Sequence, residues 1–234
     1  GCSQSNTGLG EGLSNLPINW DNQQQGIWVT GWGEVTAVPD IAVLTLGIEA
    51  QAASVAEAQS EAAEAMNRVM DALTDNGVAE KDIQTQYFSI SKVTRWDEEN
   101  QREVVIGYRV TNMVTAKIRD IDKAGTIIDA VAEAGGDLTR IDSIGFSIDD
   151  PSAYYEEARE KAMADAKAKA EQLAELAGIT LGKPTYISEG TYIPTTTYPR
   201  VMYEEAAVPA PPTPISPGEM EISLTVQVVY AILD

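Results

Sequence analysis

The chain has 234 residues, with 16 basic and 36 acidic side chains, one cysteine and no histidine, and its formal net charge is −20. That charge repels a phosphate backbone and argues against nucleic-acid binding. The missing histidine excludes Ser-His-Asp and Cys-His catalysis, and a single cysteine excludes internal disulfides and zinc-finger sites. We therefore expect an acidic, non-enzymatic protein that binds no metal and no cofactor.

The first 26 residues indicate a tether and a spacer. Cys2 follows a small residue, Gly1, and precedes a polar stretch rich in Gly, Ser, Asn and Gln. This arrangement is typical of a lipoprotein whose signal peptide has been removed, with the lipid on Cys2. The alternative is that Gly1 is a cloning remnant and Cys2 an ordinary exposed thiol. No run of about 18 apolar residues is present, so the lipid would be the membrane contact.

Two strands are predicted next, over residues 27–35 and 42–49, with a turn at Pro39-Asp40. Because side chains alternate along a strand, Ile27 and Val29 share one face of the first strand, and Trp28 and Trp32 share the other. The second strand places its aliphatic residues on one face.

Three helices follow from capping signals and apolar spacing. Ser54 and Glu57 form a capping box that opens a helix ending at Asn76-Gly77. A short helix is expected over 122–134, and the longest over 152–177, where Asp150 can cap the first turn. Alanines recur every four residues along that last helix, and such a ridge allows close packing.

Further strands are predicted over residues 83–94, 104–118, 140–148, 184–192 and 220–232. The first and second helix-to-strand passages resemble each other weakly, since residues 83–90 and 141–148 match at four positions. A Pro-rich loop of residues 193–218 precedes the last strand and is expected to be extended. The inward-facing side chains of the two longest strands are predicted to be Val104, Ile106, Tyr108, Val110, Val114, Ala116 and Ile118, and Met220, Ile222, Leu224, Val226, Val228, Tyr230 and Ile232.

Strands with one polar face need only one apolar covering layer. The sequence therefore predicts an α+β fold in which a long-stranded antiparallel sheet, built from repeated helix–strand units, is covered on one face by about three helices. The predicted organisation is a spacer over residues 1–26 and one domain over residues 27–234.

In their order and spacing, these features resemble the SIMPL-domain family of microbial envelope proteins. The likeness extends from about residue 27 to residue 232, and no single motif decides it. The chain departs from the family pattern in placing Trp32 between two glycines and in its high acidity. The residues that carry the resemblance are Val29, Thr30, Gly31, Gly33, Pro39, Asp40, Gly77, Val78, Asp82, Phe88, Tyr108, Asn112, Gly145, Phe146, Ala158, Ala162, Ala166, Leu181, Gly182, Pro217, Gly218 and Glu219.

The resemblance implies a cell-envelope location outside the cytoplasm, a tendency to form homo-oligomers, and a link to envelope or oxidative stress. It carries over no catalytic residue, because the family has no agreed catalytic constellation. The leading hypothesis is a lipid-tethered, non-enzymatic envelope protein that self-assembles or scaffolds.

The alternative hypothesis is a module that binds an extracellular peptide or glycan. Trp28 and Trp32 share a strand face that other strands leave polar, and exposed aromatic patches often mark partner surfaces. The N-terminal spacer or the Pro-rich loop could equally cover them. Tyr192, Tyr198 and Tyr203 in that loop fit either ligand contact or docking onto the domain.

Other candidate sites have simpler interpretations. Gly31-Trp32-Gly33 lacks the third glycine and the helix of a phosphate loop, so close packing of a strand against a helix is favoured. The acidic runs 97–99 and 149–150 lack the spacing of a calcium loop and fit a hairpin tip and a helix cap. The adjacent pairs Glu156-Glu157 and Glu204-Glu205 do not face each other across a cleft, as a glycosidase requires.

Overall fold

The computed structural model describes residues 26–190 and 213–233, and these ranges contain three α-helices and seven strands. The predicted α+β fold with antiparallel strands is confirmed. The strands lie in two sheets, of four and three strands, where the alternation pattern had suggested one. Contacts divide the described residues into two units, one comprising residues 34–158 and 213–223, the other residues 26–33, 159–190 and 224–233.

The four-stranded sheet has the order β3-β4-β2-β5. Its strands are β2 (Ile41–Ala52), β3 (Ile83–Asp97), β4 (Arg102–Ile118) and β5 (Thr139–Ser147). The central strand β2 is antiparallel to both β4 and β5, and β3 pairs with β4 as a long hairpin. The hairpin continues to the pair Asp97–Arg102, whereas the pairing of β2 with β4 stops at Ala52–Tyr108.

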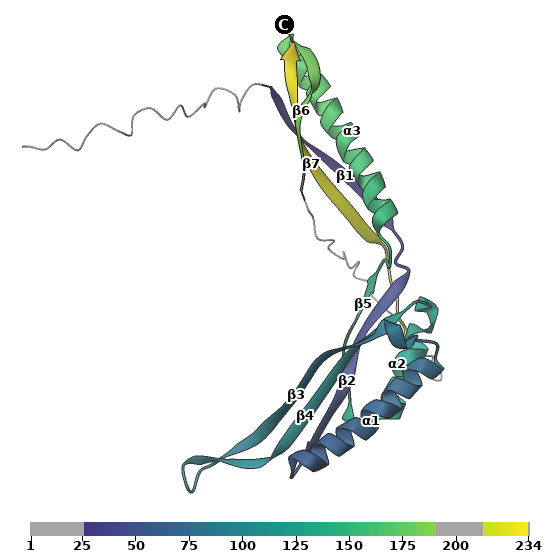
Figure 1. Ribbon diagram of the computed structural model, residues 1–234, viewed down its shortest axis with the longest axis vertical. Coiled ribbons are helices and arrows are strands. Elements are labelled where there is room, and N and C mark those ends of the chain that lie inside the picture. Colours follow the sequence, from purple (N-terminus) through teal and green to yellow (C-terminus); the bar gives the residue numbers. More distant parts are fainter. Residues whose placement is uncertain (1–25, 191–212, 234) are drawn as a thin grey trace, which may run out of the picture. The chain divides into compact units, whose positions relative to one another are not determined.

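Helices α1 (Val55–Asp75) and α2 (Ala124–Gly135) cover one face of this sheet (Figure 1). The predicted cap is present, since the hydroxyl of Ser54 accepts a hydrogen bond from the Glu57 amide at 3.3 Å. Helix α1 ends at Asn76, and Gly77 has a φ of +91°. The core between helices and sheet is aliphatic, and its largest fully buried side chains are Leu44, Leu46, Ile48, Val69, Leu73, Val110, Ile118, Ile127 and Val131.

The three-stranded sheet has the order β1-β7-β6 and contains β1 (Ile27–Ala37), β6 (Thr180–Gly190) and β7 (Met220–Leu233). Helix α3 (Ser152–Ala177) has the predicted bounds, and Asp150 caps it by accepting a hydrogen bond from the Ser152 amide at 3.0 Å. All five alanines of the predicted ridge are buried: Ala158, Ala162, Ala166, Ala170 and Ala174.

The structure differs from the sequence prediction at the ends of several strands. Strand β6 begins at Thr180 rather than 184, because Thr180 and Leu181 already pair with Leu233 and Ile232. Ile106 and Ile232, predicted to face inward, are 48% and 46% exposed. Ile106 lies where β4 has no β2 partner, and Ile232 lies near the last residue of its strand.

Candidate functional site

Three aromatic side chains lie on one face of the three-stranded sheet, and we call Trp28, Trp32 and Tyr186 the aromatic face. The burial of β1 alternates along its whole length, and each tryptophan is 50% exposed. The rings of Trp28 and Tyr186 are tilted by 35°, with centroids 6.4 Å apart. The segments considered as covers for the tryptophans, residues 1–25 and 191–212, lie outside the described part of the chain.

Tyr186 joins the tryptophans through strand register. It pairs with Val229 of β7, and Val229 is only 4% exposed although it lies on the face away from α3. Alternation in the sequence predicts a strand at Tyr186 but not its place beside Trp28. That place depends on the β6–β7 register, which contains two irregularities that periodicity does not show.

Gly31 is the point where α3 comes closest to β1. A Cβ built on Gly31 would stand 1.9 Å from the carbonyl oxygen of Ala162 and 2.7 Å from the Cβ of Ala166. No side chain fits there, so the glycine permits the contact. The interpretation of Gly31-Trp32-Gly33 as a strand packed on a helix is confirmed.

Two side chains of α3 bond the backbone of β1, which is an edge strand of its sheet. The Trp32 amide donates to Oδ2 of Asp165 at 2.8 Å, and the Lys169 ammonium donates to the Thr30 carbonyl at 3.0 Å. Asp165 and Lys169 also pair with each other at 2.6 Å. The hydrogen bonds from Lys169 and from the Trp32 amide lower the pKa of Asp165, so the carboxylate stays ionised.

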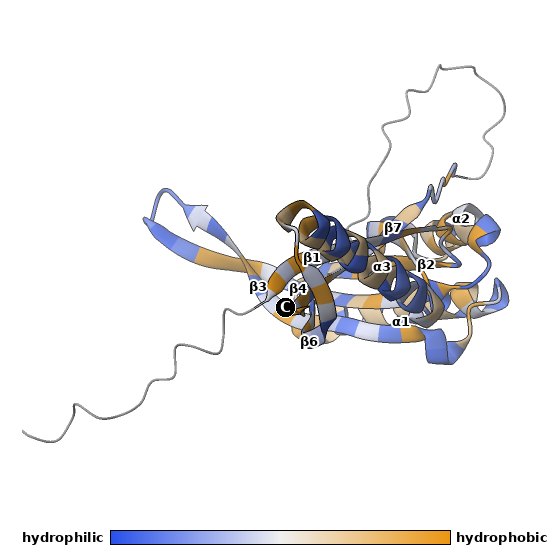
Figure 2. Cartoon of the chain, turned by 90° about the horizontal axis from the view of Figure 1, so that it is seen from above, coloured by the Kyte–Doolittle hydropathy of each residue, from blue (hydrophilic) through white to orange (hydrophobic). Residues whose placement is uncertain are grey.

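Exposed apolar side chains also lie on β3, an edge strand of the four-stranded sheet. Phe88 and Ile90 share one face of the strand, because they pair with Asn112 and Val110 of β4, and Phe88 is 52% exposed. Tyr87 pairs with Met113 and lies on the opposite face. We call the edge formed by Tyr87, Phe88 and Ile90 the β3 surface. Further along the hairpin, Trp96, Val105 and Ile106 are exposed as well. Figure 2 shows a hydrophobic stretch of this hairpin close to its hydrophilic tip.

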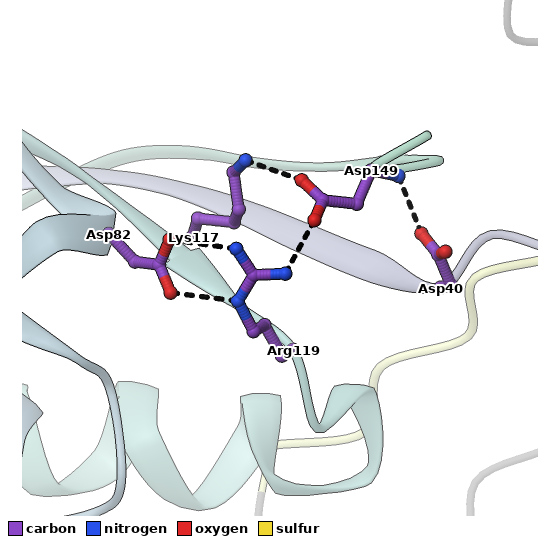
Figure 3. Close-up of polar contacts among 5 residues, drawn as sticks. All are labelled: Asp40, Asp82, Lys117, Arg119 and Asp149. Carbon is purple, nitrogen blue, oxygen red and sulfur yellow. Dashed lines mark hydrogen bonds and ion pairs between the residues drawn. The ribbon is translucent and has the colours of Figure 1, made fainter. Parts of the chain in front are cut away.

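A polar network joins four segments of the larger unit (Figure 3). Arg119, just after β4, bonds Asp82 in the 3-10 turn Glu80–Asp82 at 2.8 and 3.0 Å, and it also bonds Asp149. Asp149 accepts a second bond from Lys117 at 2.6 Å. The Asp149 amide donates to the carboxylate of Asp40 at 2.7 Å, which ties the β1–β2 turn to the segment before α3.

The charges of this network determine its protonation. Lys117, and then Arg119, lower the pKa of Asp149 from its ordinary 3.8 to about 2. Arg119 also lowers the pKa of Asp82, while Asp82 and Asp149 raise the pKa of Arg119. Asp82 and Asp149 are thus held ionised and each is bonded to a cation, as in a structural ion-pair network. The predicted helix cap at residues 149–150 is confirmed for Asp150. Asp149 instead bonds Lys117 and Arg119, a role that the sequence does not indicate.

The acidic run at residues 97–99 lies at the hairpin tip, as predicted. The carboxylate of Asp97 accepts hydrogen bonds from the amides of Glu99 and Asn100 and from the Asn100 side chain, at 2.8–3.2 Å. Within residues 26–190 and 213–233 no three His, Cys, Asp or Glu residues form a metal-type cluster. Cys2, Tyr192, Tyr198, Tyr203, Glu204 and Glu205 lie outside the described residues.

None of the described helices is both long enough and apolar enough to cross a membrane. Residues 27–230 match the SIMPL family, described as "Protein of unknown function (DUF541)". The 26 kDa periplasmic immunogenic protein of Brucella melitensis is 36% identical over 220 residues, which cover 90% of this chain and 86% of that protein.

Two less similar relatives are both called uncharacterized protein YggE. The one from Edwardsiella ictaluri is 31% identical over 157 residues, covering 67% of this chain and 64% of that protein. The one from Escherichia coli strain K12 is 29% identical over 165 residues, covering 70% of this chain and 65% of that protein. The family match over residues 27–230 agrees with the resemblance seen in the sequence, which extends from about residue 27 to residue 232. The chain therefore belongs to the SIMPL family.

Proposed function

We propose that this chain is an extracytoplasmic, lipid-tethered, non-enzymatic protein that self-assembles into a scaffold. The location is supported by the name of its relative, a periplasmic immunogenic protein. The tether is supported by Cys2, the one cysteine, at the head of a polar stretch. The lack of histidine and the pairing of the network carboxylates favour a non-enzymatic role.

The observation that carries the proposal is the β3 surface. An edge strand presents backbone donors and acceptors to any strand that approaches, and natural proteins cover or charge such edges. The edge of β1 is covered in this way, because Asp165 and Lys169 of α3 bond its backbone. The edge strand β3 instead exposes Phe88 and Ile90 on one face and Tyr87 on the other. Exposed apolar and aromatic side chains of this kind are typical of a protein–protein interface.

The charge of the β3–β4 hairpin also favours association. Two copies of a chain with a net charge of −20 repel each other, so contact is least costly where the local charge is lowest. Over residues 83–118 the charges nearly cancel, because Lys92, Arg95, Arg102, Arg109 and Lys117 oppose Asp97, Glu98, Glu99 and Glu103. The hairpin is therefore the part of the larger unit best suited to meet a second copy.

Sedimentation velocity of the full chain tests the assembly. A Cys2→Ser background excludes adventitious disulfide dimers. We expect concentration-dependent oligomers that are lost in Phe88→Asp, which puts a charge in the apolar contact. Ser91→Asp adds the same charge to the same strand without removing an apolar group and serves as the matched control. A strict monomer at high concentration would refute self-assembly.

The tether and the stress link are tested separately. Mass spectrometry of native protein should find Cys2 acylated, and a free thiol there would refute the anchor. Loss of the protein should sensitise cells to peroxide or to envelope-damaging agents. Restoration by the intact chain, but not by Phe88→Asp, would connect that phenotype to assembly.

A further inference from the structure

We propose that the aromatic face of the three-stranded sheet binds an uncharged oligosaccharide. The proposal goes beyond assembly through β3 and concerns the other unit of the chain. It is carried by four features: the half-exposed rings, their apolar support, the free polar groups beside them and the absence of charge.

The aromatic side chains form a platform on which sugar rings can stack. Trp28 and Trp32 are four residues apart on one face of β1, which at 3.3 Å per residue is about 13 Å. The rings of Trp28 and Tyr186 lie close together, and Val229, which pairs with Tyr186, is buried on the same face. Both rings therefore pack against an apolar side chain while about half of each remains exposed. A ligand that reaches both Trp28 and Trp32 must be elongated, as an oligosaccharide is.

Polar side chains lie on the same face as the rings. The β6–β7 register pairs Tyr186 with Val229, Ser188 with Gln227 and Gly190 with Thr225, which places these residues on one side. Thr30 lies between the two tryptophans on β1. The side chains of Thr30, Ser188, Thr225 and Gln227 form no hydrogen bond with any other described residue, so their donors and acceptors can bond sugar hydroxyls.

The aromatic face carries no charged side chain between Trp28 and Trp32 on β1, or among Tyr186, Ser188 and their β7 partners Val229 and Gln227. Glu34 and Glu221 lie farther along the same faces of β1 and β7. Glu189, the charged residue nearest in sequence to Ser188, lies on the α3 side and pairs with Arg159 at 2.6 Å. An uncharged surface on a protein of net charge −20 is complementary to a neutral ligand. A second copy of the chain would instead bring another 20 negative charges to the contact.

The backbone of β1 favours a glycan over a peptide. Peptides commonly bind a sheet by adding a strand to its edge through main-chain hydrogen bonds. On β1 the Trp32 amide and the Thr30 carbonyl already bond Asp165 and Lys169. A ligand at Trp28 and Trp32 must therefore lie across the face of the sheet, where stacking and hydroxyl contacts are available.

Titration calorimetry of the full chain with chitohexaose and with cellohexaose, two neutral glycans, tests the proposal. We expect saturable binding of at least one of them. Trp28→Ala and Trp32→Ala should each raise the Kd about tenfold, the effect of losing one aromatic contact. Trp28→Tyr retains a ring and should retain most of the affinity. The matched control is Trp96→Ala, since Trp96 is a 58% exposed tryptophan of the β3–β4 hairpin and should not affect binding.

Several outcomes would overturn this proposal while leaving the scaffold proposal unaffected. One is the absence of binding to both glycans at millimolar concentration in a folded protein, as judged by circular dichroism. Another is an equal loss of affinity in Trp96→Ala. A third is that Trp28→Ala abolishes oligomers in sedimentation velocity, which would assign the aromatic face to a second copy. Binding of an uncharged peptide in place of either glycan would assign it to a peptide.

Discussion

Gly31 of β1 lies against the carbonyl oxygen of Ala162 on α3, and a Cβ built on the glycine would stand 1.9 Å from that oxygen. The contact brings the buried alanine ridge of α3 directly onto the strand. It also brings Asp165 and Lys169 within hydrogen-bonding distance of the β1 backbone. Because side chains alternate on β1, the same packing turns Trp28 and Trp32 to the opposite face.

Gly31→Ala should therefore be strongly destabilising. The added methyl group must displace the backbone of α3, and overpacking of this kind costs about 2 kcal/mol or more in the free energy of unfolding. Urea unfolding followed by circular dichroism measures the change. Gly145→Ala is the matched control, because a Cβ on Gly145 meets nothing within 4 Å. It should change stability by less than about 0.5 kcal/mol, and equal effects of the two variants would contradict the close packing.

Asp165→Ala removes the acceptor of the Trp32 amide and the partner of Lys169. We expect a loss of about 1 kcal/mol in the free energy of unfolding, the typical value of one hydrogen bond. We also expect more aggregation, measured by light scattering, because the edge of β1 becomes available to another strand. Glu171→Ala is the control, since Glu171 forms a comparable pair with Lys167 at 3.6 Å on the same helix. If Glu171→Ala aggregates as much as Asp165→Ala, then loss of the bonds to the β1 edge does not cause the aggregation.

The network around Arg119 should stabilise the fold only above a certain pH. The pKa of Asp149 is about 2 in the folded chain and 3.8 ordinarily, and that of Asp82 is also lowered. The folded state thus favours the ionised carboxylates, so their contribution is complete above about pH 4 and is lost as the pH falls towards 2. In this window the unfolded chain binds more protons, and stability rises with pH.

Arg119→Met tests this dependence. At pH 7 the variant should have a Tm a few degrees lower than the parent chain, because two carboxylates lose a cation. The difference in Tm should shrink as the pH falls from 4 to 2. Arg102→Met is the control, since Arg102 forms no ion pair with any described residue, and it should show little difference at any pH. A difference for Arg119→Met that stays constant with pH would contradict the assignment.

Salt should strengthen the proposed assembly. Repulsion between chains with a net charge of −20 is screened as the Debye length falls from about 30 Å at 0.01 M to about 8 Å at 0.15 M ionic strength. Apolar contacts at the β3 surface are not weakened by the same change. Sedimentation velocity across this range should show oligomers increasing with salt, and their dissociation by salt would indicate an interface held by ion pairs.

The elements of the fold could be predicted from the sequence because local signals determine them. The cap at Ser54, the end of α1 at the Asn76 cap and the bounds of α3 follow from capping chemistry and spacing. The division into two sheets could not be predicted, because alternation identifies the two faces of a strand and not its neighbours. Strand β1 precedes β2 in the chain but lies beside β7.

In the candidate sites, too, local patterns could be predicted from the sequence and contacts between distant residues could not. Alternation placed Trp28 and Trp32 on one face, and both are exposed. Tyr186 required the irregular β6–β7 register, and Arg119 bonds Asp82 and Asp149, which lie 37 and 30 positions away in the chain. Ile106 was predicted to be buried because the alternation of β4 continues beyond the end of β2, where no core remains.

The described end of the Pro-rich loop is held to α2 at a definite point. Thr213 bonds Asp129 through its amide at 3.3 Å and its hydroxyl at 2.7 Å, and a Cβ on Gly125 would stand 2.3 Å from the Thr213 carbonyl. Seven residues before β7 begins, the chain is thus fixed to a helix that packs on the four-stranded sheet. A larger side chain at Gly125 would therefore displace the segment that leads into β7 as well as the helix itself.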